Sequence, residues 1–114
     1  MKYNMDYYIL CYDPKAKNKR RIEKVKGSKI VYGFVDYSND YELLPKLFIY
    51  KDGDRFVLSD AMSGLQIWRS YKLKELKEWA EDKSIVYEIL KRYNTDTTRE
   101  QINMFQSLIN GCGY

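Results

Sequence analysis

The sequence contains no histidine, two cysteines, two prolines and six scattered glycines in 114 residues. The absence of histidine removes the commonest general base, the Ser-His and Cys-His nucleophile pairs and most zinc sites. The glycines match neither G-x-G-x-x-G nor G-K-[ST], the patterns of phosphate-binding loops. We therefore predict a protein that is not an enzyme and that uses no cofactor or metal.

The cysteines and the hydropathy profile bear on where the protein works. Cys11 and Cys112 form no C-x-x-C pair, which favours free thiols with Cys11 packed in a strand; a bridge between them is the alternative. No apolar run is long enough to span a bilayer, and the first residues do not form a signal peptide, because their apolar core is short and interrupted by tyrosine and no small-residue cleavage site follows it. We expect a soluble cytoplasmic protein that does not contact membranes.

Positive charge is concentrated in one short segment. Residues 15–29 hold eight basic residues against one acidic residue, a net charge of +7, so the rest of a chain of net charge +4 sums to −3. Such a block attracts acidic partners and neutralises phosphates without regard to sequence. The candidate binding residues are Lys15, Lys17, Lys19, Arg20, Arg21, Lys24, Lys26 and Lys29. The alternative is a solvated loop whose charge only aids solubility.

Hydrophobic periodicity predicts strands first and helices last. Alternation of period two indicates strands at about 7–12, 46–50, 55–59 and 65–70, with a type I′ turn at Asp52-Gly53. From residue 71 the period becomes 3.6 and indicates a first helix, a second that Ser84 caps and Asn94 ends, and a third over 98–110 that begins at a Thr97/Glu100 capping box and ends at Gly111. The prediction is one α+β domain, 1–114: an antiparallel sheet of four or five strands in 1–70 packed against two or three helices in 71–111.

The basic segment at 13–29 leaves two interpretations open. Asp13 and Pro14 suit the start of a helix that would end at Gly27. Alternatively, a loop precedes a strand at about 20–26, a hairpin turn at Gly27-Ser28 and a second strand over 29–37. We favour the hairpin, because Ala16, Ile22 and Val25 form only a thin apolar stripe for a helix.

The stretch KIVYGFVDY, residues 29–37, resembles the signature strand of RNA-recognition domains. Residues 32–37 match the last six positions of K/R-G-F/Y-G/A-F-V-x-F/Y, whereas Ile30 and Val31 do not match the first two. The resemblance implies that Tyr32 and Phe34 stack on bases. That family requires β-α-β-β-α-β order, however, and packing of aromatic residues within a sheet is the simpler explanation.

The twelve tyrosines exceed what so small a core can bury. Tyrosine is enriched where proteins contact one another, so some of these rings are expected at a binding surface. One candidate is an acidic aromatic patch suited to a basic protein surface, formed by Asp36, Tyr37, Asp40, Tyr41 and Glu42. The alternative is the codon bias of an AT-rich genome, which raises Lys, Asn, Ile and Tyr together.

Carboxylates offer the remaining route to catalysis. Asp52, Asp54 and Asp60 could gather near one hairpin, and Glu75-Leu76-Lys77 has the acidic-x-Lys pattern of metal-dependent nucleases. Turn formation explains the first two aspartates and a solvated helix face explains Glu75 and Lys77, so a nuclease is the weakest hypothesis.

The leading hypothesis is a non-enzymatic binding protein that blocks a nucleic-acid-handling host protein or nucleoprotein complex by surface contact. Small size, divided charge and AT-rich composition resemble accessory proteins of phages and mobile elements, including anti-CRISPR proteins; the likeness is one of composition. The alternative is a small nucleic-acid-binding protein that acts directly through residues 15–29. Neither hypothesis fixes the oligomeric state.

Overall fold

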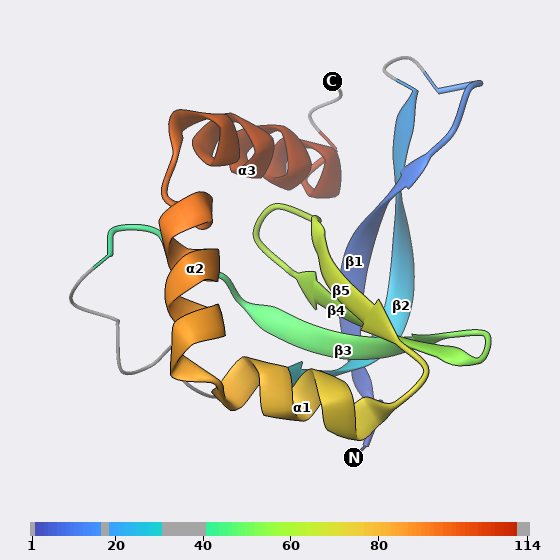
Figure 1. Cartoon of the computed structure of the whole chain (residues 1–114). Helices are drawn as coiled ribbons and strands as arrows, with labels where there is room; N and C mark the ends of the chain where they lie inside the picture. Colours follow the sequence, from blue (N-terminus) through green and yellow to red (C-terminus); the bar gives the residue numbers. More distant parts are fainter. Residues whose placement is uncertain (1, 17–18, 31–40, 112–114) are drawn as a thin grey trace.

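The strands form a meander at the start of the chain, and the helices follow it (Figure 1). The computed structural model describes residues 2–16, 19–30 and 41–111. Five antiparallel strands lie in chain order across one sheet: β1 (Met5–Tyr12), β2 (Arg20–Ile30), β3 (Leu47–Asp52), β4 (Arg55–Asp60) and β5 (Gln66–Ser70). The helices are α1 (Leu73–Glu81), α2 (Lys83–Tyr93) and α3 (Asp96–Ile109). This confirms the predicted α+β fold and differs from the strand and helix order of RNA-recognition domains.

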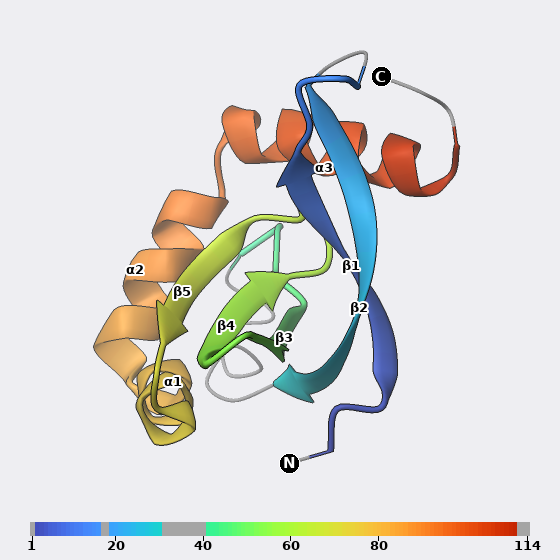
Figure 2. The ribbon, with the colours of Figure 1, turned by 90° about the vertical axis from the view of Figure 1, so that its right-hand side faces the viewer.

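Helices α1 and α2 cover one face of the sheet. Leu76 and Ala80 on α1 and Val86 and Leu90 on α2 are fully buried against sheet residues such as Leu58. Their spacing places them on one side of each helix, as the 3.6-residue period predicted. Figure 2 shows both helices beside the β5 edge of the sheet, whereas the β1–β2 ribbon stands at the other edge.

The opposite face of the sheet is closed by the β1–β2 ribbon. The Tyr7 ring stacks on Phe48 with centroids 4.1 Å apart and parallel planes. Ile9 and Val25 pack against the same cluster, in which Phe48 and Val57 are fully buried. The twisted β1–β2 ribbon therefore covers the core cluster on this face, as helices α1 and α2 cover the cluster on the other face.

The structure at Gly27 differs from the predicted hairpin turn. Gly27-Ser28 is not a hairpin turn, and residues 20–30 are not helical: β2 runs through both residues, and Gly27 pairs with Met5 on one side and Tyr50 on the other. A Cβ atom there would lie 3.0 Å from the Ile49 carbonyl oxygen and from the rings of Phe48 and Tyr7. The glycine permits a close approach between strands, not a reversal of the chain.

The β3–β4 hairpin was predicted correctly, but its turn lies one residue further on. Asp52 pairs with Arg55, so Gly53 and Asp54 are the two central residues. Gly53 has a φ of +62°, and the only described non-glycine residue with positive φ is Lys19. Positive φ at the first central residue alone is the requirement of a type II′ turn, so the predicted type I′ turn is wrong.

Two helix caps also differ from the prediction. Asp82, rather than Ser84, caps α2 by accepting hydrogen bonds from the backbone of Ser84 and Ile85. Thr95, rather than Thr97, caps α3 by accepting from the backbone of Thr98. Both shifts put the capping oxygen two or three residues before the amide that it satisfies, which is the usual N-cap geometry.

A buried carboxylate joins the sheet to the helices. Asp60 is fully buried and accepts five hydrogen bonds, which come from the backbone of Lys46, Met62 and Ser63, the Ser63 hydroxyl and the Tyr93 hydroxyl. Burial, and secondarily the Asp60 charge, raise the pKa of Tyr93 far above its ordinary value of 10.0. The Tyr93 hydroxyl therefore stays protonated at neutral and mildly alkaline pH and continues to donate its hydrogen bond to Asp60.

None of the helices in the described part of the chain is both long and apolar enough to cross a membrane.

Candidate functional site

The described basic residues of the 15–29 segment lie on a two-stranded ribbon that projects from the sheet, here named the arm and defined as β1, β2 and the described connecting residues 13–16 and 19. Its strands pair without a break from Met5 with Gly27 to Tyr12 with Arg20. One face holds Tyr7, Ile9 and Val25 and packs on the core. The other face belongs to neither core cluster of the described residues and is the exposed surface of the arm.

Two pairs of a cation and a ring lie on that exposed face, with an aliphatic pair between them. Successive cross-strand pairs join Tyr8 to Lys24, Leu10 to Ile22 and Tyr12 to Arg20. The Lys24 ammonium lies 5.8 Å from the Tyr8 ring centroid, and the Arg20 guanidinium lies 5.7 Å from that of Tyr12. Each cation is thus held over an aromatic face, which orients it without neutralising it.

The remaining charges of the arm divide into paired and unpaired groups. Arg21 lies 3.8 Å from Asp13 and 3.6 Å from Glu23, and Lys26 lies 2.6 Å from Asp6. The hydrogen bond from Lys26 holds the pKa of Asp6 below its ordinary value. In the described ranges of the chain, no carboxylate lies within ion-pair distance of five arm cations, which are Lys15, Lys19, Arg20 and Lys24 in the part beyond the pairing with β3, and Lys29 at the base.

The tip of the arm is shaped by its own hydrogen bonds. The Asp13 carboxylate accepts from the Lys15 amide at 2.9 Å, and the Asp13 amide donates to the Lys19 carbonyl at 2.9 Å. Lys19 itself adopts a left-handed φ of +58°. Asp13 therefore has a structural role in the turn, and the turn presents Lys15 and Lys19 near the paired strands.

Six of the sequence-predicted site residues lie outside the described residues, namely Lys17, Tyr32, Phe34, Asp36, Tyr37 and Asp40. Of the predicted acidic aromatic patch, Tyr41 packs against the helix-side core and meets Tyr87 edge-on with centroids 6.4 Å apart. Glu42 forms a charge-assisted hydrogen bond with Arg99 of α3, and that bond lowers the pKa of Glu42. Lys29 is exposed at the base of the arm.

Cys11 is a half-buried free thiol in β1, as predicted, and it donates to the Glu23 carboxylate at 3.3 Å. Burial, and secondarily this contact, raise the pKa of the Cys11 thiol. A raised pKa means less thiolate at neutral pH, so the arm presents a weakly reactive cysteine. Cys112 lies outside the described residues.

The carboxylates considered for catalysis are separated. Asp52 lies beside the β3–β4 turn, whereas Asp60 pairs with Leu47 at the other end of the same hairpin and is buried. Glu75 belongs to α1, where Lys74 and Glu78 form an exposed ion pair at 3.7 Å. Within the described ranges, no three His, Cys, Asp or Glu side chains gather closely enough to hold a metal ion.

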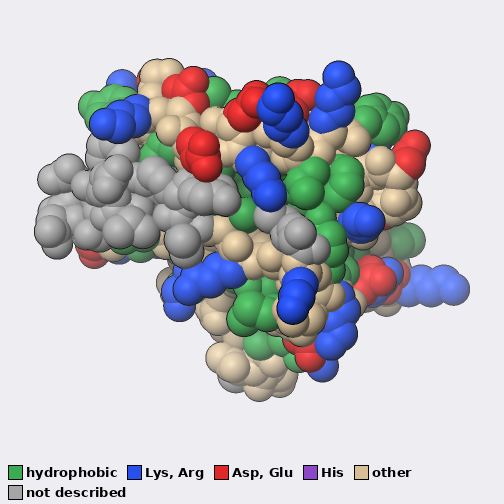
Figure 3. Space-filling view, turned by 90° about the horizontal axis from the view of Figure 1, so that it is seen from below, with side chains coloured by type: hydrophobic (Ala, Val, Ile, Leu, Met, Phe, Trp, Pro, Cys, Tyr) green, Lys and Arg blue, Asp and Glu red, His purple; other side chains and the backbone are tan. Residues whose placement is uncertain are grey.

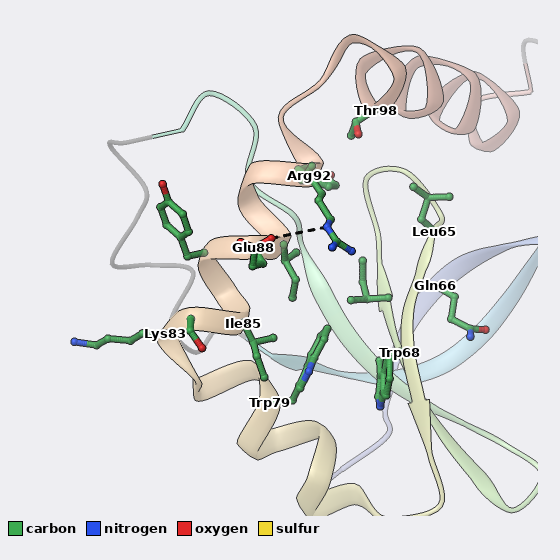
Figure 4. Close-up of a pocket in the computed structure, with 14 residues that line it drawn as sticks. Leu65, Gln66, Trp68, Trp79, Lys83, Ile85, Glu88, Arg92 and Thr98 are labelled. Carbon is green, nitrogen blue, oxygen red and sulfur yellow. Dashed lines mark ion pairs between the residues drawn. The ribbon is translucent and has the colours of Figure 1, made fainter.

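Sequence reasoning missed a groove of about 880 Å³ between β5 and α2. Trp68 and Trp79 stack at its base with centroids 5.6 Å apart, and Leu65 and Thr98 lie toward its other end (Figure 4). Its residues come from four separate parts of the chain, so no local motif marks it. The available signal was Trp68 itself, a large ring on an edge strand with no assigned role.

The surface seen from the α1 side differs from the arm. There, Lys and Arg side chains are interspersed with Asp and Glu and with hydrophobic patches (Figure 3). Mixed charges of this kind give little net attraction for a polyanion. The arm is therefore the stronger candidate for recognition of negative charge.

Comparisons of the chain with protein-family models, with curated proteins and with solved structures found no match.

Proposed function

We propose that this is a non-enzymatic binding protein, working in the cytoplasm, that contacts nucleic acid through the exposed face of the arm. The observation that carries the proposal is the set of four cations in the projecting part of the arm, Lys15, Lys19, Arg20 and Lys24, that have no carboxylate partner among the described residues. A cation without an internal partner gives up only water and counterions when it binds a phosphate. No ion pair within the protein has to be broken, so the attraction to the phosphate contributes in full to binding.

The shape of the arm supports the same function. A two-stranded ribbon fits the major groove of a duplex, which is about 12 Å wide. Tyr12 is exposed, and Tyr8 is half-buried beside Lys24, so both rings lie near the cations that would meet the backbone. Rings beside cations also suit single strands, whose bases stack on aromatic faces.

The test is binding to fluorescein-labelled single- and double-stranded DNA and RNA, measured by anisotropy from 50 to 300 mM salt. Four phosphate contacts predict a slope of about −3 to −4 for log K against log salt. The double variant with Arg20→Gln and Lys24→Gln should reduce the slope magnitude by about 2 and should bind at least tenfold more weakly at low salt.

The control is the double variant Lys74→Gln with Lys77→Gln, which removes the same charge from α1 and should leave the slope unchanged. Salt-independent binding, or equal losses in both double variants, contradicts the proposal. Because the sequence has no histidine, binding should also be the same at pH 6 and pH 8.

A second candidate function is the inhibition of a nucleic-acid-handling host protein by surface contact, as in accessory proteins of phages and mobile elements. The groove beside Trp68 favours it, because a largely apolar groove at the other edge of the sheet from the arm suits contact with a protein. Affinity purification from a low-GC bacterial lysate would support this function if a nucleic-acid-handling protein is retained by the pure chain after nuclease treatment. Recovery of such proteins only when nucleic acid is intact would assign the interaction to the arm.

A further inference from the structure

The groove between β5 and α2 concentrates exposed apolar side chains. Leu65, Trp68 and Tyr87 are 40%, 46% and 47% exposed, and all three line it. Large exposed apolar residues gathered in one concave surface mark a binding site more often than scattered ones do. Tryptophan, tyrosine and arginine, which dominate the energetics of protein interfaces, are all present in this lining.

One cation of the groove, Arg92, is placed to meet a negative group of a partner. Arg92 projects from the end of α2 into the space facing β5 (Figure 4). The only carboxylate within ion-pair distance of Arg92 among the described residues is that of Glu88, at the limiting distance of 4.0 Å. Lys83 lies at the other end of the same helix, but its side chain points away from β5 (Figure 4), so Arg92 is the cation that faces the groove.

The dimensions suit a short stretch of polypeptide. Helix α2 has 11 residues, which corresponds to a length of about 16 Å. About five residues of extended chain span that length. The groove is open to solvent, which an extended segment requires, whereas many small-molecule sites are enclosed.

We propose that this groove binds an extended segment of a partner protein, in which apolar side chains contact the Trp68–Trp79 stack and an acidic side chain pairs with Arg92. Side chains hold the segment, because the β4–β5 ladder has an irregularity between Leu58 and Ser59 that interrupts the regular edge. A bulged, five-residue edge strand is a poor template for addition of another strand.

The test begins with selection of a random dodecapeptide phage library on the intact protein. Peptides that lack tryptophan are then synthesised and titrated while the intrinsic fluorescence is followed. Trp68 and Trp79 are the only tryptophans and both line the groove, so occupancy should shift their emission. The expected peptides combine apolar residues with at least one Asp or Glu.

Arg92→Gln should weaken the selected peptides at least tenfold, whereas Lys91→Gln, a neighbouring exposed cation outside the groove, should not. Replacing the acidic residue of the peptide by its amide should cause a similar loss with wild-type protein and little further loss with Arg92→Gln. Both substitutions are at exposed positions, and thermal unfolding verifies that the fold is retained.

Three outcomes of the peptide experiments overturn the proposal, and a fourth comes from a small carboxylate. The three are a selection that yields no peptide dependent on Arg92, a consensus that is basic, and binding that leaves tryptophan emission unchanged. Equal affinity for a small carboxylate such as 4-phenylbutyrate would also overturn it, because the groove would then be a ligand site for small acids. None of these outcomes depends on whether the arm binds nucleic acid.

Discussion

The arm and the helix-covered body differ in how they are stabilised. In the body, residues distant in sequence meet in a core where Leu58, Leu76 and Leu90 are fully buried. In the part of the arm beyond the pairing with β3, strands β1 and β2 pair with each other, and the exposed face consists of cross-strand pairs such as Tyr12 with Arg20. The buried contacts of the body therefore determine the stability of the fold, whereas the exposed residues of the arm contribute little to stability and are available to bind a partner.

The largest expected effect concerns Asp60 in the body. Asp60→Ala removes the acceptor of five hydrogen bonds and leaves buried donors of Ser63 and Tyr93 unsatisfied. The expected loss is about 3 kcal/mol or more of unfolding free energy, which urea denaturation measures. Arg20→Gln, in the arm, should change stability by less than about 0.5 kcal/mol. Equal losses would contradict the division between the two regions.

The junction of arm and body should show an intermediate effect. In Gly27→Ala, the added methyl group would meet the Ile49 carbonyl oxygen and the Tyr7 and Phe48 rings, each 3.0 Å from the Cβ position. We expect a loss of about 1–3 kcal/mol, because neighbouring backbone must shift. Gly53→Ala has open space but a φ of +62°, and it provides a control for backbone strain alone. Hydrogen exchange of β1 amides should accelerate only in Gly27→Ala.

The smallest effect is the dependence of stability on pH. Hydrogen bonds from Arg99 and from Ser84 lower the pKa of Glu42 and Asp82 below their ordinary values of 4.5 and 3.8. A carboxyl whose pKa is lower in the folded state stabilises the fold above its ordinary pKa, and this stability is lost as pH falls through the lowered folded value. Thermal midpoints should therefore be level between pH 5 and 8, where no histidine titrates, and should fall below about pH 4. A midpoint that changes between pH 5 and 8 would contradict this.

Sequence patterns predicted the elements better than the contacts between them. The hydrophobic period located all three helices and the strands around Gly53, since the period depends on neighbouring residues. Gly27 was misassigned because a glycine required by a close approach to Tyr7 looks the same in sequence as a turn glycine. The two helix caps were displaced because several capping residues are adjacent.

The candidate sites follow the same division. The cationic arm was visible in the sequence because its basic residues are clustered within residues 15–29, although the pairing of Lys26 with Asp6 was not. The groove was invisible because Trp68, Trp79 and Arg92 meet only after the strands and helices have packed.

The most direct measurement of the arm's role is a ¹⁵N-¹H NMR titration of the protein with a short DNA or RNA duplex and with the corresponding single strands. The proposed function predicts that amide shifts change mainly at residues 8–12 and 19–24, and that the changes diminish as salt rises. Changes confined to the groove between β5 and α2, or no changes with any of these nucleic acids at low salt, would contradict it.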